Sequence, residues 1–524
     1  MKVFIKTPNI QGTTRQHSAT ESTTEAAHRL TTEGYRVMPV GDVALLNNNV
    51  SYRSTPYVVS QGTGAFAEVP SMLEEKHTVA TRADAEAYLS RLQAYARALD
   101  GETGRIEADA RAGVLLPGFL NDVTVRQMRA VADQPADKWD LVTGLARKAR
   151  VAKLEGDWAA RAARIVAGEV RPALQRQIAS LAALRPRADD TPGMWDLPDG
   201  AARYAWLVEA GTTTKSTPDE IHASGLEQCR ALEAQLDPLL RAQGLTQGTA
   251  GQRLTALGKR SDLLFPNTDA GRAELLKYLE SVVARIRPMM PRAFNKLVPG
   301  RLLIQRVPPA IEAGAPNGYA GPGSLDGKLP GLYYINLRDT GIWPRYSLPT
   351  LTFHEGIPGH IWQGEYTFDL PLIRTLLASN AYSEGWALYA EQLADELGFY
   401  EGDPLGRIGY LQSMLFRAAR LVADTGLHHK RWTMPRAVAF FTGTTGITES
   451  QARSELNRYC AWPGQALGYK TGHNEINRLR DRARAALGAR YDGRAFNDLV
   501  VTTGNVPLDV LGRQVERWTA GRRA

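Results

Sequence analysis

A short segment in the C-terminal half of the chain gathers residues that could bind a metal ion and use it. It reads Thr352-Phe-His-Glu-Gly-Ile-Pro-Gly-His-Ile-Trp-Gln363 and holds two of the nine histidines of the chain, His354 and His360. Glu355 directly follows the first of them. A neutral imidazole is a good zinc ligand, and a carboxylate beside a metal-activated water can accept its proton. The segment therefore favours metal-assisted hydrolysis.

The spacing of the two histidines departs from the usual helical motif, His-Glu-x-x-His, in which they face the same way. Here they are six residues apart, a step of about 240° on a regular helix, so that on an unbroken helix the rings point apart. Pro358 removes a helical donor, and Gly356 and Gly359 reach conformations closed to other residues. We expect the backbone to unwind between Gly356 and Gly359 so that both rings meet one metal. The alternative is a plain helix-breaking turn between a capping histidine and a surface histidine.

A carboxylate from a second segment completes the candidate site. Residues 381–398 have helical periodicity, and Glu384 lies 24 residues after His360, which leaves room for a loop and a returning helix. A zinc site with two histidines needs one more protein ligand and keeps a fourth position for water. Glycine and tryptophan follow Glu384, and this pair is unusual within an exposed helix. The pair favours a ligand role for Glu384 over a solvent-facing position. Glu391, two turns later, is a competing ligand.

Together the two segments resemble the bacterial family called domain of unknown function 885, which is regarded as a family of zinc metallopeptidases. The resemblance rests on His354–Gln363 and Ser383–Glu391 and extends over about residues 80 to 515. Further matching segments are 420–428, 458–459, 463–470 and 504–508. It implies a mostly α-helical, elongated enzyme with a central cleft, similar to angiotensin-converting enzyme and the oligopeptidases, whose metal motif is two residues shorter.

The same resemblance assigns roles to residues of the two segments. It implies that His354, His360 and Glu384 are the zinc ligands and that Glu355 is the catalytic base. These are the roles that the chemistry of the residues already favoured.

Other polar residues are candidates for supporting roles. Tyr469, His428 and Arg420 could each donate to the oxyanion that develops on an attacked carbonyl; tyrosines at comparable late positions of the resembling peptidases do so. Each also has a structural alternative: Tyr469 could pack in the core, His428 could cap a helix, and Arg420 could pair with Asp424. Zinc-bound histidines normally donate their second ring hydrogen to a carboxylate or carbonyl, and both Glu391 and Asp424 are candidate acceptors.

Helices dominate the chain that must position this site. From Thr81 a helical stripe runs over residues 88–99, and Gly101 is the expected end of that helix. Capping signals mark further helix starts at Thr217 and Thr448. These starts recur without a fixed repeat length, and the pattern indicates a mainly helical architecture.

The convincing strands of the main body are residues 302–307 and 332–337. Between them lies the Gly- and Pro-rich loop 314–331, which could form a flap over a cleft. If the second strand is an edge strand beside the metal, it can hold an extended peptide, and Tyr334 and Asn336 would touch substrate. Alternatively, both residues cover the core. We therefore predict a mainly α, elongated multi-helix fold with a small central β-sheet and a cleft.

Composition excludes several classes of protein. The chain has 524 residues, of which 43% are hydrophobic and 23% charged, enough for a large core and unlike a disordered or fibrous protein. The net charge is +8, but both signs alternate along the helices, unlike the basic stripe of a nucleic-acid-binding protein. The two cysteines, Cys229 and Cys460, form no disulfide framework. No run approaches the roughly 18 apolar residues of a membrane-spanning helix.

The domain boundaries follow from these patterns. Residues 1–78 are rich in Thr, Ser, Gly and Asn and form an extension of uncertain order. A helical zinc-hydrolase domain is predicted over 79–515, with 79–300 and 301–515 as candidate lobes, and a tail over 516–524. The start shows no apolar run that fits a signal peptide. We expect a cytoplasmic protein, or an exported or periplasmic one if the natural start differs.

The sequence thus predicts a zinc-dependent hydrolase that cleaves amide bonds in short peptides. The expected cofactor is Zn²⁺ and the expected partner is a small peptide, with no nucleic acid and no membrane. One alternative is a metal-dependent esterase or amidase that acts on a non-peptide substrate. Another is a non-catalytic helical protein with structural zinc, which would have four protein ligands. Peptide length, the peptide end that is attacked and the oligomeric state are left open.

Overall fold

The structure, a computed structural model, describes residues 55–523 except 310–311, 313–316, 372–373 and 375–378. The described residues form two compact units. Unit 1 comprises residues 205–456 and 464–523, and unit 2 comprises residues 55–204 and 457–463. The candidate lobe boundary near residue 300 falls inside unit 1, and residues 1–54 of the predicted extension lie outside the described part.

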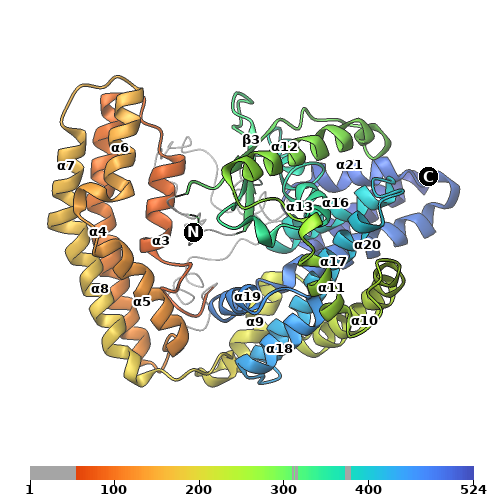
Figure 1. The fold of residues 1–524 in the computed structure, drawn as a ribbon, viewed down its shortest axis with the longest axis horizontal. Coiled ribbons are helices and arrows are strands. Elements are labelled where there is room, and N and C mark those ends of the chain that lie inside the picture. Colours follow the sequence, from red (N-terminus) through yellow and green to blue (C-terminus); the bar gives the residue numbers. More distant parts are fainter. Residues whose placement is uncertain (1–54, 310–311, 313–316, 372–373, 375–378, 524) are drawn as a thin grey trace. The chain divides into compact units, whose positions relative to one another are not determined.

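Unit 2 is a bundle of helices, drawn in orange and yellow in Figure 1. Its helices are α3 (Ala65–Ser71), α4 (Arg82–Arg111), α5 (Gly118–Ala132), α6 (Asp140–Val151), α7 (Trp158–Ile165) and α8 (Arg171–Leu184). The predicted stripe over 88–99 is buried in its core, together with Val59 and Leu73 from within the predicted extension. The side chain of Thr81 caps α4 by accepting a hydrogen bond from the backbone N–H of Asp84.

The prediction that α4 ends at Gly101 is wrong, because the helix continues for ten more residues to Arg111. Ile106 and Ala110 are buried in this continuation. A single glycine within a helix costs only about 1 kcal/mol relative to alanine, and burial of these two side chains outweighs that.

Unit 1 contains the other helices of the described chain, apart from the ends that α9 and α19 share with unit 2. They are α9 (Gly200–Thr212), α10 (Pro218–Ala242), α11 (Ala250–Gly258), α12 (Asp269–Ile286), α13 (Leu348–Glu355), α14 (His360–Tyr366), α16 (Asn380–Glu396), α17 (Pro404–His428), α18 (Met434–Thr445), α19 (Glu449–Ala461), α20 (Leu467–Leu487), α21 (Gly493–Thr503) and α22 (Leu508–Arg523). Both predicted helix starts are confirmed, since Thr217 and Thr448 cap α10 and α19. The predicted tail continues α22.

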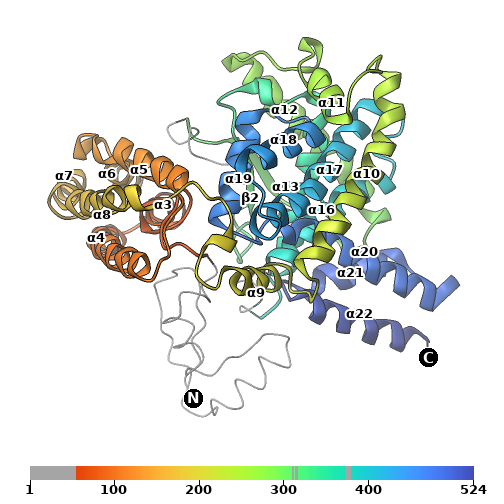
Figure 2. The same cartoon turned by 90° about the horizontal axis from the view of Figure 1, so that it is seen from below.

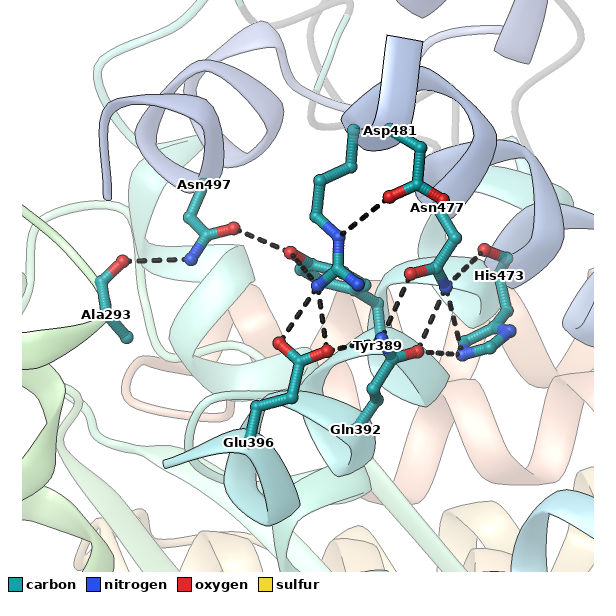
Figure 3. A network of polar contacts seen from close by, with 9 residues as sticks. Ala293, Tyr389, Gln392, Glu396, His473, Asn477, Asp481 and Asn497 are labelled. Atoms are coloured by element: carbon teal, nitrogen blue, oxygen red, sulfur yellow. Dashed lines mark hydrogen bonds and ion pairs between the residues drawn. The ribbon is translucent and has the colours of Figure 1, made fainter. Parts of the chain in front are cut away.

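Helices α16 and α20 of unit 1 pack closely against each other, and both views of the ribbon place them side by side (Figures 1 and 2). A Cβ atom on Gly472 of α20 would lie 1.8 Å from the carbonyl oxygen of Ala381 in α16. Farther along, Gln392 of α16 accepts hydrogen bonds from His473 and Asn477 of α20 (Figure 3). The two helices therefore form a rigid pair.

A three-stranded sheet lies in unit 1, with the order β1 (Leu302–Arg306), β3 (Gly331–Ile335), β2 (Gly318–Gly321). β1 is parallel to β3, and β2 is antiparallel to it. Both predicted strands are confirmed. β2 lies within the predicted loop and was not predicted as a strand, because its four residues lack an apolar alternation. β3 is the middle strand and not an edge strand, so β1 and β2 are the edge strands. The mainly α fold with a small sheet is confirmed.

Candidate metal centre

The chain unwinds between the two histidines of the metal segment. α13 ends at Glu355 and α14 begins at His360. A Cβ atom on Gly359 would lie 1.9 Å from the carbonyl oxygen of His354, so only glycine fits this turn. The indole N–H of Trp386 in α16 donates to the carbonyl oxygen of Pro358 at 2.9 Å and anchors the turn. The break expected from the glycines and the proline is therefore present.

The break brings three candidate ligands together. The ligand atoms of His354, His360 and Glu384 all lie within 4.8 Å of one another. The Nε2 atoms of His354 and His360 lie 3.4 Å and 3.3 Å from the same carboxylate oxygen, Oε2 of Glu384. That oxygen is buried, and no donor among the described residues forms a well-aligned hydrogen bond with it. Two imidazoles and one carboxylate are a donor set that suits zinc, so these residues fit a metal ion.

Electrostatics at this group favour a positive charge between the side chains. Burial lowers the pKa of His354, but the close carboxylates of Glu384 and Glu391 and the charge of Glu355 outweigh it and raise the pKa to about 9. Burial also acts to raise the pKa of Glu384, and the facing histidines hold it well below its usual value. In the metal-free protein a proton therefore takes the place that a cation would take.

Of the two candidate acceptors for the second ring nitrogen, the structure selects Glu391. Its Oε1 lies 2.8 Å from Nδ1 of His354, and the residue is fully buried. Asp424 instead accepts the backbone N–H of Gly464 with both carboxylate oxygens. Glu391 is therefore not a member of the metal group, but the partner on the far side of the first imidazole.

The three candidate oxyanion donors lie on α17 and α20. The ring of Tyr469 stacks parallel to that of His354, with centroids 6.4 Å apart. The guanidinium of Arg420 lies 4.3 Å from the centre of the Tyr469 ring and donates to Glu455 at 2.9 Å. His428 is the last residue of α17 and is buried. Tyr469 is thus beside the first histidine, and donation to an oxyanion stays a prediction for all three residues.

The two predicted substrate contacts have internal partners. Tyr334 stacks on Tyr319 of β2, with centroids 5.1 Å apart. Asn336 is buried, and its side-chain amide donates to the carbonyl oxygen of Glu312 at 2.7 Å. The alternation of β3 turns Tyr333, and not Tyr334, to the face that packs on α14, where a Cβ atom on Gly331 would meet Ile361. Contact of Tyr334 or Asn336 with substrate stays a prediction.

Sequence reasoning missed Ser413 and Arg417, which reach the site from α17. The hydroxyl of Ser413 donates to Oε2 of Glu391 at 2.6 Å, and Arg417 donates to that hydroxyl at 2.7 Å. It also missed Ser383, whose hydroxyl lies 3.4 Å from Nδ1 of His360. The four-residue spacing of Ser413 and Arg417 places them on one helix face, but nothing local indicates what that face contacts.

A family comparison matches residues 7–515 with the family described as "Bacterial protein of unknown function (DUF885)". The chain belongs to this family. A comparison with curated proteins found no match for this DUF885 protein. No helix among its described residues is long and apolar enough to cross a membrane.

The solved structures that resemble this DUF885 protein include two that are each described as a "putative lipoprotein". The one from Colwellia psychrerythraea is 34% identical with a TM-score of 0.86, and the alignment covers 89% of this chain and 81% of that chain. The one from Shewanella oneidensis, described as of unknown function, is 18% identical with a TM-score of 0.62, over 86% of this chain and 81% of that chain. The second likeness shows the fold alone.

Proposed function

We propose that this DUF885 protein is a zinc-dependent hydrolase that cleaves amide bonds in short peptides. The observation that carries the proposal is the convergence of His354, His360 and Glu384, with Glu355 directly after the first ligand. Glu355 is buried, as a base that works away from bulk water must be. The family resemblance implies the same assignment.

The residues of the chain divide the work of hydrolysis between them. A zinc ion held by the three ligands supplies Lewis acidity, which polarises a carbonyl and makes water more acidic. Glu355 accepts a proton from the attacking water as the new C–O bond forms. It then passes the proton to the nitrogen that leaves when the C–N bond breaks. Tyr469 and His428 donate to the oxygen that becomes negative, and Arg420 supports Tyr469 through its ring.

We propose that a peptide substrate pairs with the β2 edge of the sheet. β2 packs against both metal-binding helices: its Gly318 lies beside Leu351 of α13, and Pro322, the next residue after the strand, lies beside Gly364 of α14. An extended peptide that pairs with β2 gains main-chain hydrogen bonds without a strong demand on its side chains. We propose this edge in place of the β3 edge expected from the sequence.

Mass spectrometry of a peptide library tests the activity. The protein should cleave peptides, lose the activity with a chelator and regain it with zinc. Glu355→Gln should keep the metal and lower kcat by at least about 10²-fold, because only the proton acceptor is lost. His360→Ala should lose the metal. Full turnover in Glu355→Gln would overturn the role of the base.

The alternatives predict different results. A panel of acyl esters and non-peptide amides beside the peptides separates a peptidase from an esterase or amidase. A structural zinc site would be closed by four protein ligands, whereas the group in the described residues has three. The open fourth position supports catalysis over a structural role.

The cellular location also belongs to this proposal. The cytoplasmic location expected from the start of the sequence gains no support from the similar structure from Colwellia psychrerythraea, which is described as a "putative lipoprotein". We propose an exported protein, the alternative that the sequence left open. Fractionation of cells that make the natural gene product tests this, and recovery in the cytoplasmic fraction alone would contradict it.

A further inference from the structure

Glu391 is a buried carboxylate that the proposed reaction does not use directly. It lies in the middle of α16, is 0% exposed and faces Nδ1 of His354 at 2.8 Å. A buried charge is costly unless other groups pair with it and satisfy its oxygens. The groups that do so decide how firmly the carboxylate, and through it the imidazole, is held.

α17 supplies these groups through two residues one turn apart. Ser413 donates its hydroxyl hydrogen to Oε2 of Glu391 at 2.6 Å, and Nη1 of Arg417 donates to the oxygen of that hydroxyl at 2.7 Å. Nη2 of Arg417 lies 3.8 Å from Oε1 of the same carboxylate. The arginine side chain is 14% exposed, so its charge is shielded little by water.

The direction of this chain of hydrogen bonds is fixed at both ends. A guanidinium has donors only, so the oxygen of Ser413 must accept from Arg417 and its single hydrogen goes to Glu391. An ionised carboxylate has acceptors only, so it must receive a hydrogen from Nδ1 of His354. The hydrogen of a neutral His354 is therefore on Nδ1, and the lone pair of Nε2 faces the metal group.

We propose that Arg417 and Ser413 are positioning residues for the first metal ligand. Acting through Glu391, they select the tautomer and orientation in which His354 binds the metal. The inference rests on the proposed metal site and assigns these two residues of α17 a part in metal affinity.

Zinc affinity of the full-length protein, measured by competition with a chromophoric chelator, tests the proposal. Loss of the outer carboxylate partner of a metal-bound histidine typically weakens metal binding 10–100-fold. Glu391→Gln should show a loss of about this size, and Ser413→Ala and Arg417→Met should each weaken zinc binding by about 5-fold or more. Because the two act in one chain, the double variant should lose less than the product of the single losses.

Conservative variants separate positioning from general damage. Ser413→Thr keeps the hydroxyl and should keep the affinity, and Arg417→Lys keeps the charge and should recover part of it. Arg407→Met removes an arginine of the same helix that is half exposed and pairs with Asp395, and it should bind zinc as the wild type does. Thermal melting of each metal-free variant shows whether it is folded. If Arg417→Met does not fold, the comparison of Ser413→Ala with Ser413→Thr decides the inference.

The outcomes distinguish this inference from the function on which it rests. Wild-type affinity in Ser413→Ala and Arg417→Met, in a protein that binds zinc, would overturn the inference alone. A wild-type protein that binds no zinc would overturn the proposed function and this inference with it. An equal loss in Ser413→Ala and Ser413→Thr would also contradict positioning by the hydroxyl.

Discussion

Glu384 and Glu391 lie seven residues apart on α16 and address opposite nitrogens of one imidazole. The first faces Nε2 of His354, where a metal would bind, and the second faces Nδ1. Two carboxylates of one helix thus have different tasks, because the ring of His354 stands between them. Their separation of about two turns puts them on a similar face at different heights.

The proton held by His354 predicts how zinc affinity depends on pH. The pKa of this histidine in the metal-free protein is about 9, and a histidine must be neutral to bind a metal. Below that pH, zinc has to displace one proton, so its affinity should rise about tenfold per pH unit from pH 7 to 9 and level off above. Chelator competition, corrected for protonation of the chelator, measures this. A flat profile between pH 7 and 9 would contradict it.

Lys470 predicts a change in stability with pH. Burial lowers its pKa from 10.5 to about 8, against the opposing charge of Glu391. Between these values the unfolded chain binds the proton more tightly than the folded one, so this residue makes the free energy of unfolding rise with pH. Relative to Lys470→Met, the wild type should therefore gain about 3 kcal/mol in free energy of unfolding between pH 7 and 10.5. Denaturant unfolding of both proteins across this range measures the difference, and a difference independent of pH would count against the prediction.

The three residues of the candidate metal group could be predicted from the sequence, whereas the residues that contact them could not. Histidine is rare in this chain, and a glutamate beside one carries a chemical meaning that does not depend on the rest of the fold. Ser413 and Arg417 are common surface residues whose role depends on which helix they face. For the same reason the sequence could not choose between Glu391 and Asp424, which only the packing of α16 and α17 separates.

At the scale of the elements, local signals predicted helix starts well and contacts between elements poorly. The predicted caps at Thr217 and Thr448 involve residues three apart in the chain, and both are present. β2 escaped prediction because pairing with β3, and not its own four residues, makes it a strand. Its presence makes β3 the middle strand and β2 one of the two edge strands.

The close contact of α16 and α20 makes a prediction about a single methyl group. In Gly472→Ala the new Cβ would overlap the backbone of Ala381, which cannot move as a flexible side chain can. The free energy of unfolding should fall by about 2 kcal/mol or more, and zinc should bind more weakly, since α16 carries Glu384. Gly443→Ala in α18 is the matched control, because nothing lies within 4 Å of its Cβ. It should be neutral or stabilising by up to about 1 kcal/mol; equal effects of the two substitutions would contradict the account.

At the scale of the molecule, the candidate metal centre and its supporting residues all belong to unit 1. The sequence predicted a helical domain over 79–515 with candidate lobes that meet near residue 300, but not the division near residue 204, because both units have the same helical pattern. Nothing in the periodicity marks where one core ends and the next begins.

This division predicts where zinc changes hydrogen exchange. A ligand that binds the folded state suppresses local opening of the segments it joins, by about 4 kcal/mol at a thousandfold excess over Kd. Zinc should therefore slow exchange in α13, α14 and α16 and leave α4 to α8 unchanged. Mass spectrometry of exchanged peptides measures this, with His360→Ala as the control that should show no effect. Equal protection of both units would contradict a site confined to unit 1.

Anomalous diffraction at the zinc edge, from crystals grown with zinc, tests the central claim most directly. The account predicts one strong peak about 2.0–2.2 Å from Nε2 of His354, Nε2 of His360 and a carboxylate oxygen of Glu384, with no fourth protein ligand. A peak elsewhere, a site closed by a fourth side chain, or no peak in a zinc-soaked crystal would contradict it.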